Sequence, residues 1–201
     1  PSAERATEVL LGGGAHGTAR LGVGASGAIS PTLSYRVDAY GERSDGERAL
    51  GKSSQGKLMS ALRWQPRDDL RFDLTADISD VKPERYFGTP TVDGRAVHAL
   101  RDQNYNVSDS DIHYEDRRLK LKAKWDIRPG LTLKNETYQF GADRHWKNIE
   151  AYSYQPALGT VDRSDYLEIG HDLSQRGNRL QLLGQAGAHQ LVVGWDHSQS
   201  R

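Results

Sequence analysis

The chain has 201 residues, of which 36% are hydrophobic and 27% are charged, and its formal net charge at pH 7 is zero. A balanced charge does not favour nucleic acid as a partner, and the absence of cysteine excludes disulfides, thiolate chemistry and thiolate metal sites. No apolar run approaches the roughly 18 residues that a membrane-spanning helix needs. Any membrane insertion would therefore use strands, in which only alternate residues meet lipid.

The first predicted unit is a glycine-rich hairpin over residues 7–29, with its turn near residues 12–14. Pro31 then marks a tight turn, because proline cannot donate a hydrogen bond to a central strand ladder. Apolar and polar residues alternate over residues 33–40, which predicts a strand with one apolar face. A polar loop follows over residues 43–55.

The same unit then repeats. A strand over residues 57–65 ends in a tight turn at residues 66–69, and the chain returns over residues 70–79 with the cleanest period-two alternation in the sequence. A loop of about thirty residues, 81–116, comes next, and loops of that length are usually functional or disordered. The strand predicted over residues 118–127 carries aliphatic residues on one parity and basic residues on the other.

The last part of the chain follows the pattern less cleanly. After a turn at residues 128–130, a strand is predicted over residues 131–140 and a third long loop over residues 141–176. Residues 179–185 and 189–195 form a final pair of strands around a short turn. The sequence thus predicts an all-β chain of about nine antiparallel strands, with short turns on one side, long loops on the other and no helix. That rhythm is typical of an up-and-down transmembrane β-barrel.

Aromatic residues favour a lipid-facing sheet over a soluble sandwich. Four of them lie within four residues of a short turn and share the parity of the aliphatic residues. A membrane interface selects such a ring of aromatics at one height. These expected interface aromatics are Tyr35, Trp64, Phe72 and Trp125.

A row of basic residues occupies the opposite parity of one strand. A single Lys or Arg facing the bilayer midplane of a barrel costs about 2–4 kcal/mol, so the row is expected to face a wet lumen. Asp73 and Asp77 share that parity on the adjacent strand, and cross-strand pairing with them is the favoured explanation over attraction of an anionic ligand. The row consists of Arg118, Lys120, Lys122 and Lys124.

Several segments, in this order and spacing, resemble the start of the barrel in TonB-dependent ferric-siderophore receptors. The resemblance spans nearly the whole chain and rests on order and spacing rather than on one diagnostic motif. The segments are 7–9 (TEV), 34–40 (SYRVDAY), 44–46 (SDG), 62–66 (LRWQP), 86–90 (YFGTP), 104–106 (NYN), 144–148 (RHWKN) and 189–196 (HQLVVGWD).

The resemblance implies a barrel of about 22 strands around an N-terminal plug. Residues 1–201 would form a partial barrel domain without the plug, covering the first nine or so strands. The protein would then reside in the bacterial outer membrane and contact its lipid. It would bind a ferric siderophore through outward loops and rely on TonB acting through the plug region, which this chain lacks. Iron would be carried only within the siderophore, with no cofactor and no enzymatic activity.

Candidate ligand contacts lie in the predicted long loops, since bulky and often anionic ferric siderophores suit aromatic faces and cationic side chains. The alternative for each is packing within its own loop or against a neighbouring loop. Tyr152 and Tyr154 share a parity and are expected to continue a strand above the membrane. The candidate contacts are Tyr86, Phe87, Arg101, Tyr105, Arg144 and Trp146.

Other signals are weak. Residues 22–27 fit the dinucleotide pattern G-x-G-x-x-G, but a new strand follows where a helix is required. The seven histidines lack ligand spacing, so no metal site is expected. The chain also opens without a hydrophobic signal segment, so the protein is either not secreted or an internal piece of a longer chain. Two alternatives stay open: a receptor for haem, cobalamin or a sugar, and a soluble all-β ligand-binding module.

Overall fold

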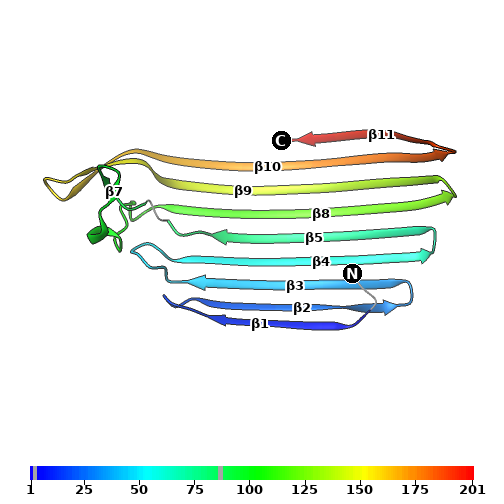
Figure 1. Ribbon diagram of the computed structural model, residues 1–201, viewed down its shortest axis with the longest axis horizontal. Helices are drawn as coiled ribbons and strands as arrows, with labels where there is room; N and C mark the ends of the chain where they lie inside the picture. Colours follow the sequence, from blue (N-terminus) through cyan, green and yellow to red (C-terminus); the bar gives the residue numbers. More distant parts are fainter. Residues whose placement is uncertain (2–3, 86–87) are drawn as a thin grey trace.

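The computed structural model describes residue 1, residues 4–85 and residues 88–201. Nine of its strands form one antiparallel sheet in which neighbours along the chain are neighbours in space (Figure 1). The expected all-β fold of about nine strands is confirmed. The strands are β1 (Ala6–Gly13), β2 (Ala19–Ser30), β3 (Leu33–Ser44), β4 (Ser53–Arg67), β5 (Leu70–Lys82), β8 (Asp111–Arg128), β9 (Leu131–Gln155), β10 (Thr160–Ala186) and β11 (His189–Ser200).

Two-residue turns join the strands at one end of the sheet, and longer connections join them at the other end (Figure 1). At residues 129–130 the turn ends on Gly130, whose φ of 77° lies in the left-handed region that suits glycine. Register shifts of one residue next to three of these turns mark β-bulges, which tighten the reversal.

The connection between β5 and β8 is the longest and spans residues 83–110. It holds a small hairpin of β6 (Thr91–Val92) and β7 (Arg95–Ala96), followed by a 3-10 helix, η1 (His98–Leu100). The prediction of a long loop here is confirmed, with slightly narrower bounds. The described residues contain no helix that is long and apolar enough to cross a membrane.

The long loop predicted over residues 141–176 is wrong. These residues form the parts of β9 and β10 that lie farthest from the two-residue turns, which we call the upper parts. The two strands pair along them, and only residues 156–159 connect them. Alternation fades here because neither face of the hairpin needs to be uniformly apolar, whereas the backbone ladder forms regardless of side-chain polarity. The two strands are therefore 25 and 27 residues long, and they project beyond their neighbours.

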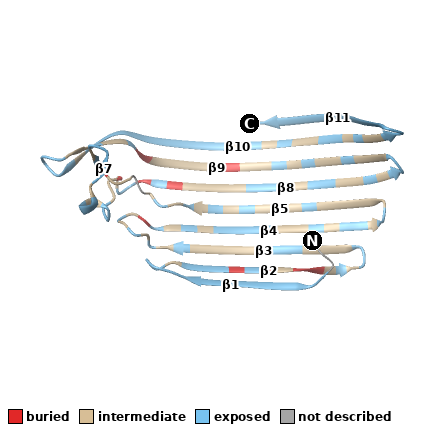
Figure 2. Ribbon diagram, in the orientation of Figure 1, coloured by how far each residue is buried: buried red, intermediate tan, exposed pale blue. Residues whose placement is uncertain are grey.

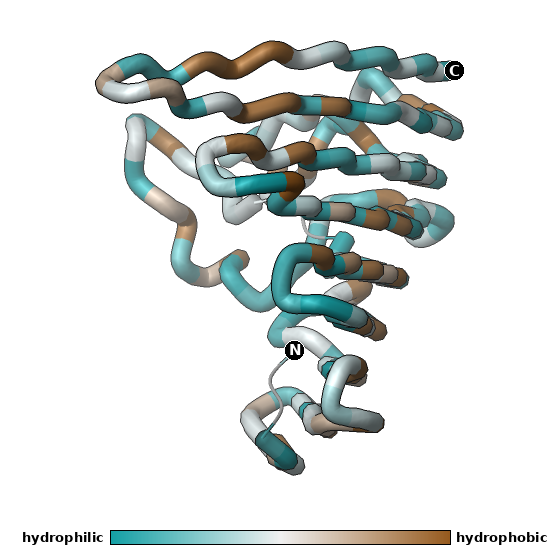
Figure 3. The backbone as a smooth tube through the Cα atoms, turned by 90° about the vertical axis from the view of Figure 1, so that its right-hand side faces the viewer, coloured by the Kyte–Doolittle hydropathy of each residue, from teal (hydrophilic) through white to brown (hydrophobic). Residues whose placement is uncertain are grey.

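The sheet is a single curved layer without a conventional core. Among the described residues only Ile112, Ala142 and Ile149 are buried hydrophobics, while a long series of Leu, Ile, Val and Trp side chains stays exposed. Figure 2 shows buried residues as short isolated segments, and Figure 3 shows hydrophobic and hydrophilic residues alternating along the strands. An exposed apolar surface of this extent requires something else to cover it.

Candidate functional site

The strand register sorts side chains onto two faces. Leu62, Leu74 and Leu121 are direct neighbours in one cross-strand row, and they define the face that we call the apolar face. The adjacent row contains Arg63, Asp73 and Lys122, which define the polar face. On β5 the apolar face runs without a charged residue from Leu70 to Ile78, a length of nine residues. That length matches the 9–11 residues of a tilted strand that crosses a bilayer.

The four predicted interface aromatics all lie on the apolar face, next to the two-residue turns. The rings of Trp64 and Phe72 stack with centroids 5.4 Å apart and an interplanar angle of 22°. Trp125 donates from Nε1 to Asp69 Oδ2 at 3.1 Å, so its polar edge meets a turn residue. Tyr35 lies opposite Leu62 in the same band. Their contact with lipid headgroups stays a prediction.

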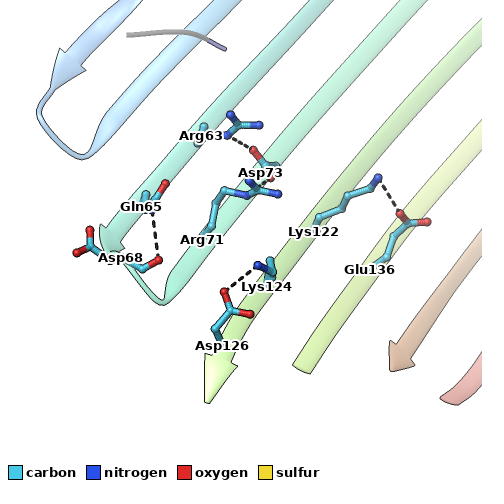
Figure 4. Close-up of polar contacts among 9 residues, drawn as sticks. All are labelled: Arg63, Gln65, Asp68, Arg71, Asp73, Lys122, Lys124, Asp126 and Glu136. Carbon is cyan, nitrogen blue, oxygen red and sulfur yellow. Dashed lines mark hydrogen bonds and ion pairs between the residues drawn. The ribbon is translucent and has the colours of Figure 1, made fainter. Parts of the chain in front are cut away.

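Salt bridges cover the lower part of the polar face, which is the part nearest the two-residue turns (Figure 4). Lys122 Nζ lies 3.4 Å from Glu136 Oε2, and Lys124 Nζ lies 2.7 Å from Asp126 Oδ2. Glu136 lies on β9, the neighbour of β8 on the side away from β5, and Asp126 lies on β8 itself. Cross-strand and same-strand pairing thus accounts for half of the predicted basic row.

The predicted partners of that row are wrong. Asp73 lies opposite Lys122 in the register, yet its oxygens are taken by Arg63 Nε at 2.6 Å and Arg71 Nε at 3.0 Å. Two guanidinium groups reach this carboxylate from β4 and from its own strand, which leaves the lysine to turn towards β9. Asp77 has no ion pair among the described residues.

The other two residues of the basic row, Arg118 and Lys120, lie farther from the two-residue turns and have different surroundings. Arg118 lies over the ring of Phe140, 5.2 Å from its centroid, and Lys120 has no ion pair within the described part of the chain. Both line a cavity of about 500 Å³ on the polar face, together with Arg179 and the carboxylates Asp77 and Glu136. A positive charge is therefore available at this height of the polar face.

Two predicted contact residues, Arg144 and Trp146, lie further up β9 on the polar face. The Arg144 guanidinium is 2.6 Å from Asp116 Oδ1 and stacks over the Tyr114 ring at 5.0 Å. Burial raises the pKa of the Tyr114 hydroxyl. Trp146 donates from Nε1 to Glu150 Oε1 at 2.8 Å, and the residue is half-buried.

The long loop 83–110 docks against the upper part of β9. Asn106 donates from Nδ2 to the carbonyl oxygen of Arg85 at 2.8 Å and also to the Asn148 side chain, and both asparagines are buried. Next to them, the Tyr105 ring stacks on Tyr152 with centroids 6.0 Å apart. Burial raises the pKa of Tyr105. Tyr152 and Tyr154 extend β9 on one parity, as predicted.

A second anchor, missed by the sequence analysis, holds the end of the loop. Asp109 Oδ2 accepts from the Tyr166 hydroxyl at 3.0 Å and lies 3.1 Å from Lys147 Nζ. These contacts, led by that with Lys147, lower the pKa of Asp109, and contacts with Tyr166 and Asp109 raise the pKa of Lys147. No sequence pattern links these three residues, because the β9–β10 pairing above the expected strand ends brings them together.

The predicted contacts therefore do not form one cluster. Tyr105 belongs to an aromatic group with Tyr152, whereas Arg144 and Trp146 lie lower on the polar face of β9. Arg101 is paired with Asp102 at 3.3 Å, and its carbonyl accepts from Arg48. The other two candidates, Tyr86 and Phe87, lie outside the described residues.

Comparisons with known proteins agree with this architecture. No family model matches the sequence, and no curated protein matches it significantly. The fold, however, matches solved structures of outer-membrane receptors. It superposes on the ferripyoverdine receptor of Pseudomonas aeruginosa bound to ferripyoverdine with a TM-score of 0.81 and 18% sequence identity, over 100% of this chain and 28% of that chain.

Two further receptors give similar superpositions. The ferric-catecholate import receptor Fiu of E. coli K12 matches with a TM-score of 0.82 and 14% identity, over 100% of this chain and 35% of that chain. The ferric preacinetobactin receptor BauA of Acinetobacter baumannii gives 0.77 and 12%, over 98% and 30%. This chain thus spans about a third of the length of these receptors.

The class of structure follows from the fold: an open antiparallel sheet that matches part of a large outer-membrane receptor barrel. More particularly, the fold is that of a barrel segment from TonB-dependent siderophore receptors. All three matched proteins are receptors.

Proposed function

We propose that this chain supplies barrel wall and extracellular loops to an outer-membrane receptor for TonB-dependent uptake of a ferric siderophore. The observation that carries the proposal is the superposition of 98–100% of the chain on three receptors for ferric siderophores. The two-faced sheet supports it independently, because a soluble sandwich would need a second layer over the apolar face, and the described residues provide none.

The apolar face would contact lipid and the polar face would line the lumen. A spanning sheet in hydrocarbon must close on itself, because unpaired backbone groups at an edge cost several kcal/mol each. In the described sheet β1 and β11 each pair on one side only. Further strands would therefore complete the wall, and TonB would act through a plug inside the closed barrel.

The binding surface would lie on the polar side of the tall β9–β10 hairpin and the loop docked on it. Trp146 offers an aromatic face, the Tyr105–Tyr152 stack offers another, and Lys120 and Arg118 offer positive charge lower down. Arg144 is already occupied by Asp116 and would act by holding Tyr114 in place. A bulky, aromatic and anionic chelate fits such a surface.

Growth of a receptor-null strain, complemented with the full-length gene, tests the proposal. We expect growth on one class of ferric siderophore, catecholate, hydroxamate or mixed, as sole iron source, and no growth without TonB. Growth restored instead by haem, or uptake of cobalamin or a sugar, would replace the siderophore by that nutrient. No TonB-dependent phenotype on any of them would refute the proposal.

Two substitutions test the binding surface in the same strain. Trp146→Ala and Tyr152→Ala should each weaken ligand binding about tenfold or more, since aromatic anchors are typical hot spots. Ser153→Ala is the matched control, because Ser153 is adjacent in β9 and points to the other face. Equal affinity in all three variants would move the binding surface elsewhere in the receptor.

A further inference from the structure

Three side chains that can ligate a metal converge at the base of the long loop 83–110. Asp80 lies near the end of β5, and His113 and Glu115 lie near the start of β8. The register places Asp80 directly opposite Glu115, with His113 two residues away on the same face. One ligand atom from each side chain lies within 4.8 Å of the other two.

The distances between the three ligand atoms fit a shared metal ion. His113 Nε2 lies 3.2 Å from Asp80 Oδ2 and 3.8 Å from Glu115 Oε1. Zinc bonds of about 2.0–2.2 Å directed to the corners of a tetrahedron would separate neighbouring ligand atoms by about 3.4 Å. The two measured separations lie on either side of that value, so a small adjustment of the side chains would complete three bonds.

The imidazole nitrogen supplies a second, independent observation. The Nε2 atom of His113 is shielded from solvent, although the side chain is 26% exposed, and Asp80 Oδ2 at 3.2 Å does not meet it with hydrogen-bond geometry. A buried ring nitrogen without a partner is costly, and two carboxylates directly opposite each other repel. A cation between the three groups would remove both costs. Arg117 engages only Oε2 of Glu115, at 3.0 Å, so Oε1 stays available.

We propose that Asp80, His113 and Glu115 bind a divalent transition-metal ion, with Zn²⁺ as the ion that best fits one imidazole and two carboxylates. The ion would join β5 to β8 where the two strands enter the 28-residue connection 83–110, and it would fix the stem of that loop. A fourth position would remain for water. Spacing along the chain cannot show this site, because only the β5–β8 pairing brings the ligands together.

A neighbouring histidine provides a matched control. His145 lies directly opposite His113 in the register and also has two carboxylates close by. Its Nδ1 lies 3.4 Å from Asp111 Oδ2, however, and its Nε2 lies 3.2 Å from Glu168 Oε1. The two carboxylates flank opposite edges of this ring, so they cannot bind one ion together with it.

The experiment is titration of the full-length protein in detergent with ZnCl₂ by isothermal calorimetry, on the wild type and on His113→Gln, Asp80→Asn and His145→Gln. We expect one saturable site in the wild type and in His145→Gln. Loss of one of three ligands should weaken zinc binding by more than tenfold, since even groups that only hydrogen-bond to a metal ligand contribute about 10–100-fold to metal affinity.

Limited trypsin digestion tests the effect on the loop, which offers Arg95 and Arg101 as cleavage sites. Zn²⁺ should slow cleavage there in the wild type and in His145→Gln, but not in His113→Gln. Absence of saturable binding, or equal affinity in all variants, would overturn the site. Selective binding without protection would overturn the role in fixing the loop.

Discussion

A lysine placed on the apolar face tests which medium that face touches. Leu121 is 43% exposed and lies on β8 between Leu74 and Thr137 in the register. It is four residues above Trp125, which corresponds to about 14 Å along the strand at a rise of about 3.4 Å per residue. At a strand tilt of about 35–45° this becomes about 10 Å along the membrane normal, close to the middle of an apolar band about 25 Å tall.

We therefore expect Leu121→Lys to destabilise the folded full-length protein in phospholipid vesicles by about 2–4 kcal/mol. This corresponds to a decrease of about 30-fold to several hundredfold in the folded-to-unfolded ratio, at about 1.4 kcal/mol per factor of ten. Ile127→Lys is the control on the same strand and face. It lies beyond Trp125 towards the turn, where the cost falls to about 0–1 kcal/mol.

Equilibrium guanidinium titrations followed by tryptophan fluorescence measure both values. Spin labels at Leu74 and Leu121 give an independent readout, since the chain has no cysteine to compete for the label. Equal costs at Leu121 and Ile127, or labels that report water, would refute a lipid-facing apolar surface and with it the receptor proposal.

Three further predictions follow from single contacts. In a double-mutant cycle, Arg63→Ala and Asp73→Ala should couple by about 0.5–1 kcal/mol, and zero coupling would show the pair to be solvated. Gly177→Ala should lower the free energy of unfolding by about 1–3 kcal/mol, because the added Cβ would lie 2.6 Å from the Tyr138 ring and 2.9 Å from the His197 carbonyl oxygen. Gly184→Ala, where nothing lies within 4 Å of an added Cβ, should change it by less than about 0.5 kcal/mol. The depressed pKa of Asp109 means that its anchor is at full strength above the ordinary aspartate pKa of about 3.9 and is lost as pH falls through the lowered value. A spin label at Ser108→Cys should thus gain mobility only in strong acid. A label that is already mobile at neutral pH would contradict this.

The sequence predicted the two-faced part of the sheet well, because an apolar face and a polar face impose opposite demands on successive residues. The alternation over residues 70–79 and the turns at Pro31 and Gly130 are visible one residue at a time. Above the apolar band this constraint disappears, and the tall β9–β10 hairpin was mistaken for a loop. Strand pairing there depends on backbone hydrogen bonds, which leave no mark on the sequence.

The partners of side chains were harder to predict than their faces. Parity placed Asp73 and Lys122 correctly on the polar face, but the choice between partners depends on reach. The carboxylate of Asp73 lies within reach of two arginines, so Lys122 pairs with Glu136 instead. The Asp80–His113–Glu115 group combines residues from both sides of the connection 83–110, and the Asp109 anchor joins the end of that connection to β9 and β10. Such sets become visible only once the register is known.

The exception to alternation on β9 shows how a polar residue can remain on the apolar face. Asn135 and Asn178 exchange side-chain hydrogen bonds of 3.0 and 3.1 Å, and Asn178 also donates to Thr137 Oγ1 at 2.6 Å. An amide without a partner would cost several kcal/mol in hydrocarbon, whereas mutually bonded amides lose far less on leaving water. The apolar face is therefore defined by the satisfaction of its polar groups as well as by hydropathy. This explains why β9 pairs in register with its more regular neighbours although its sequence pattern is weaker.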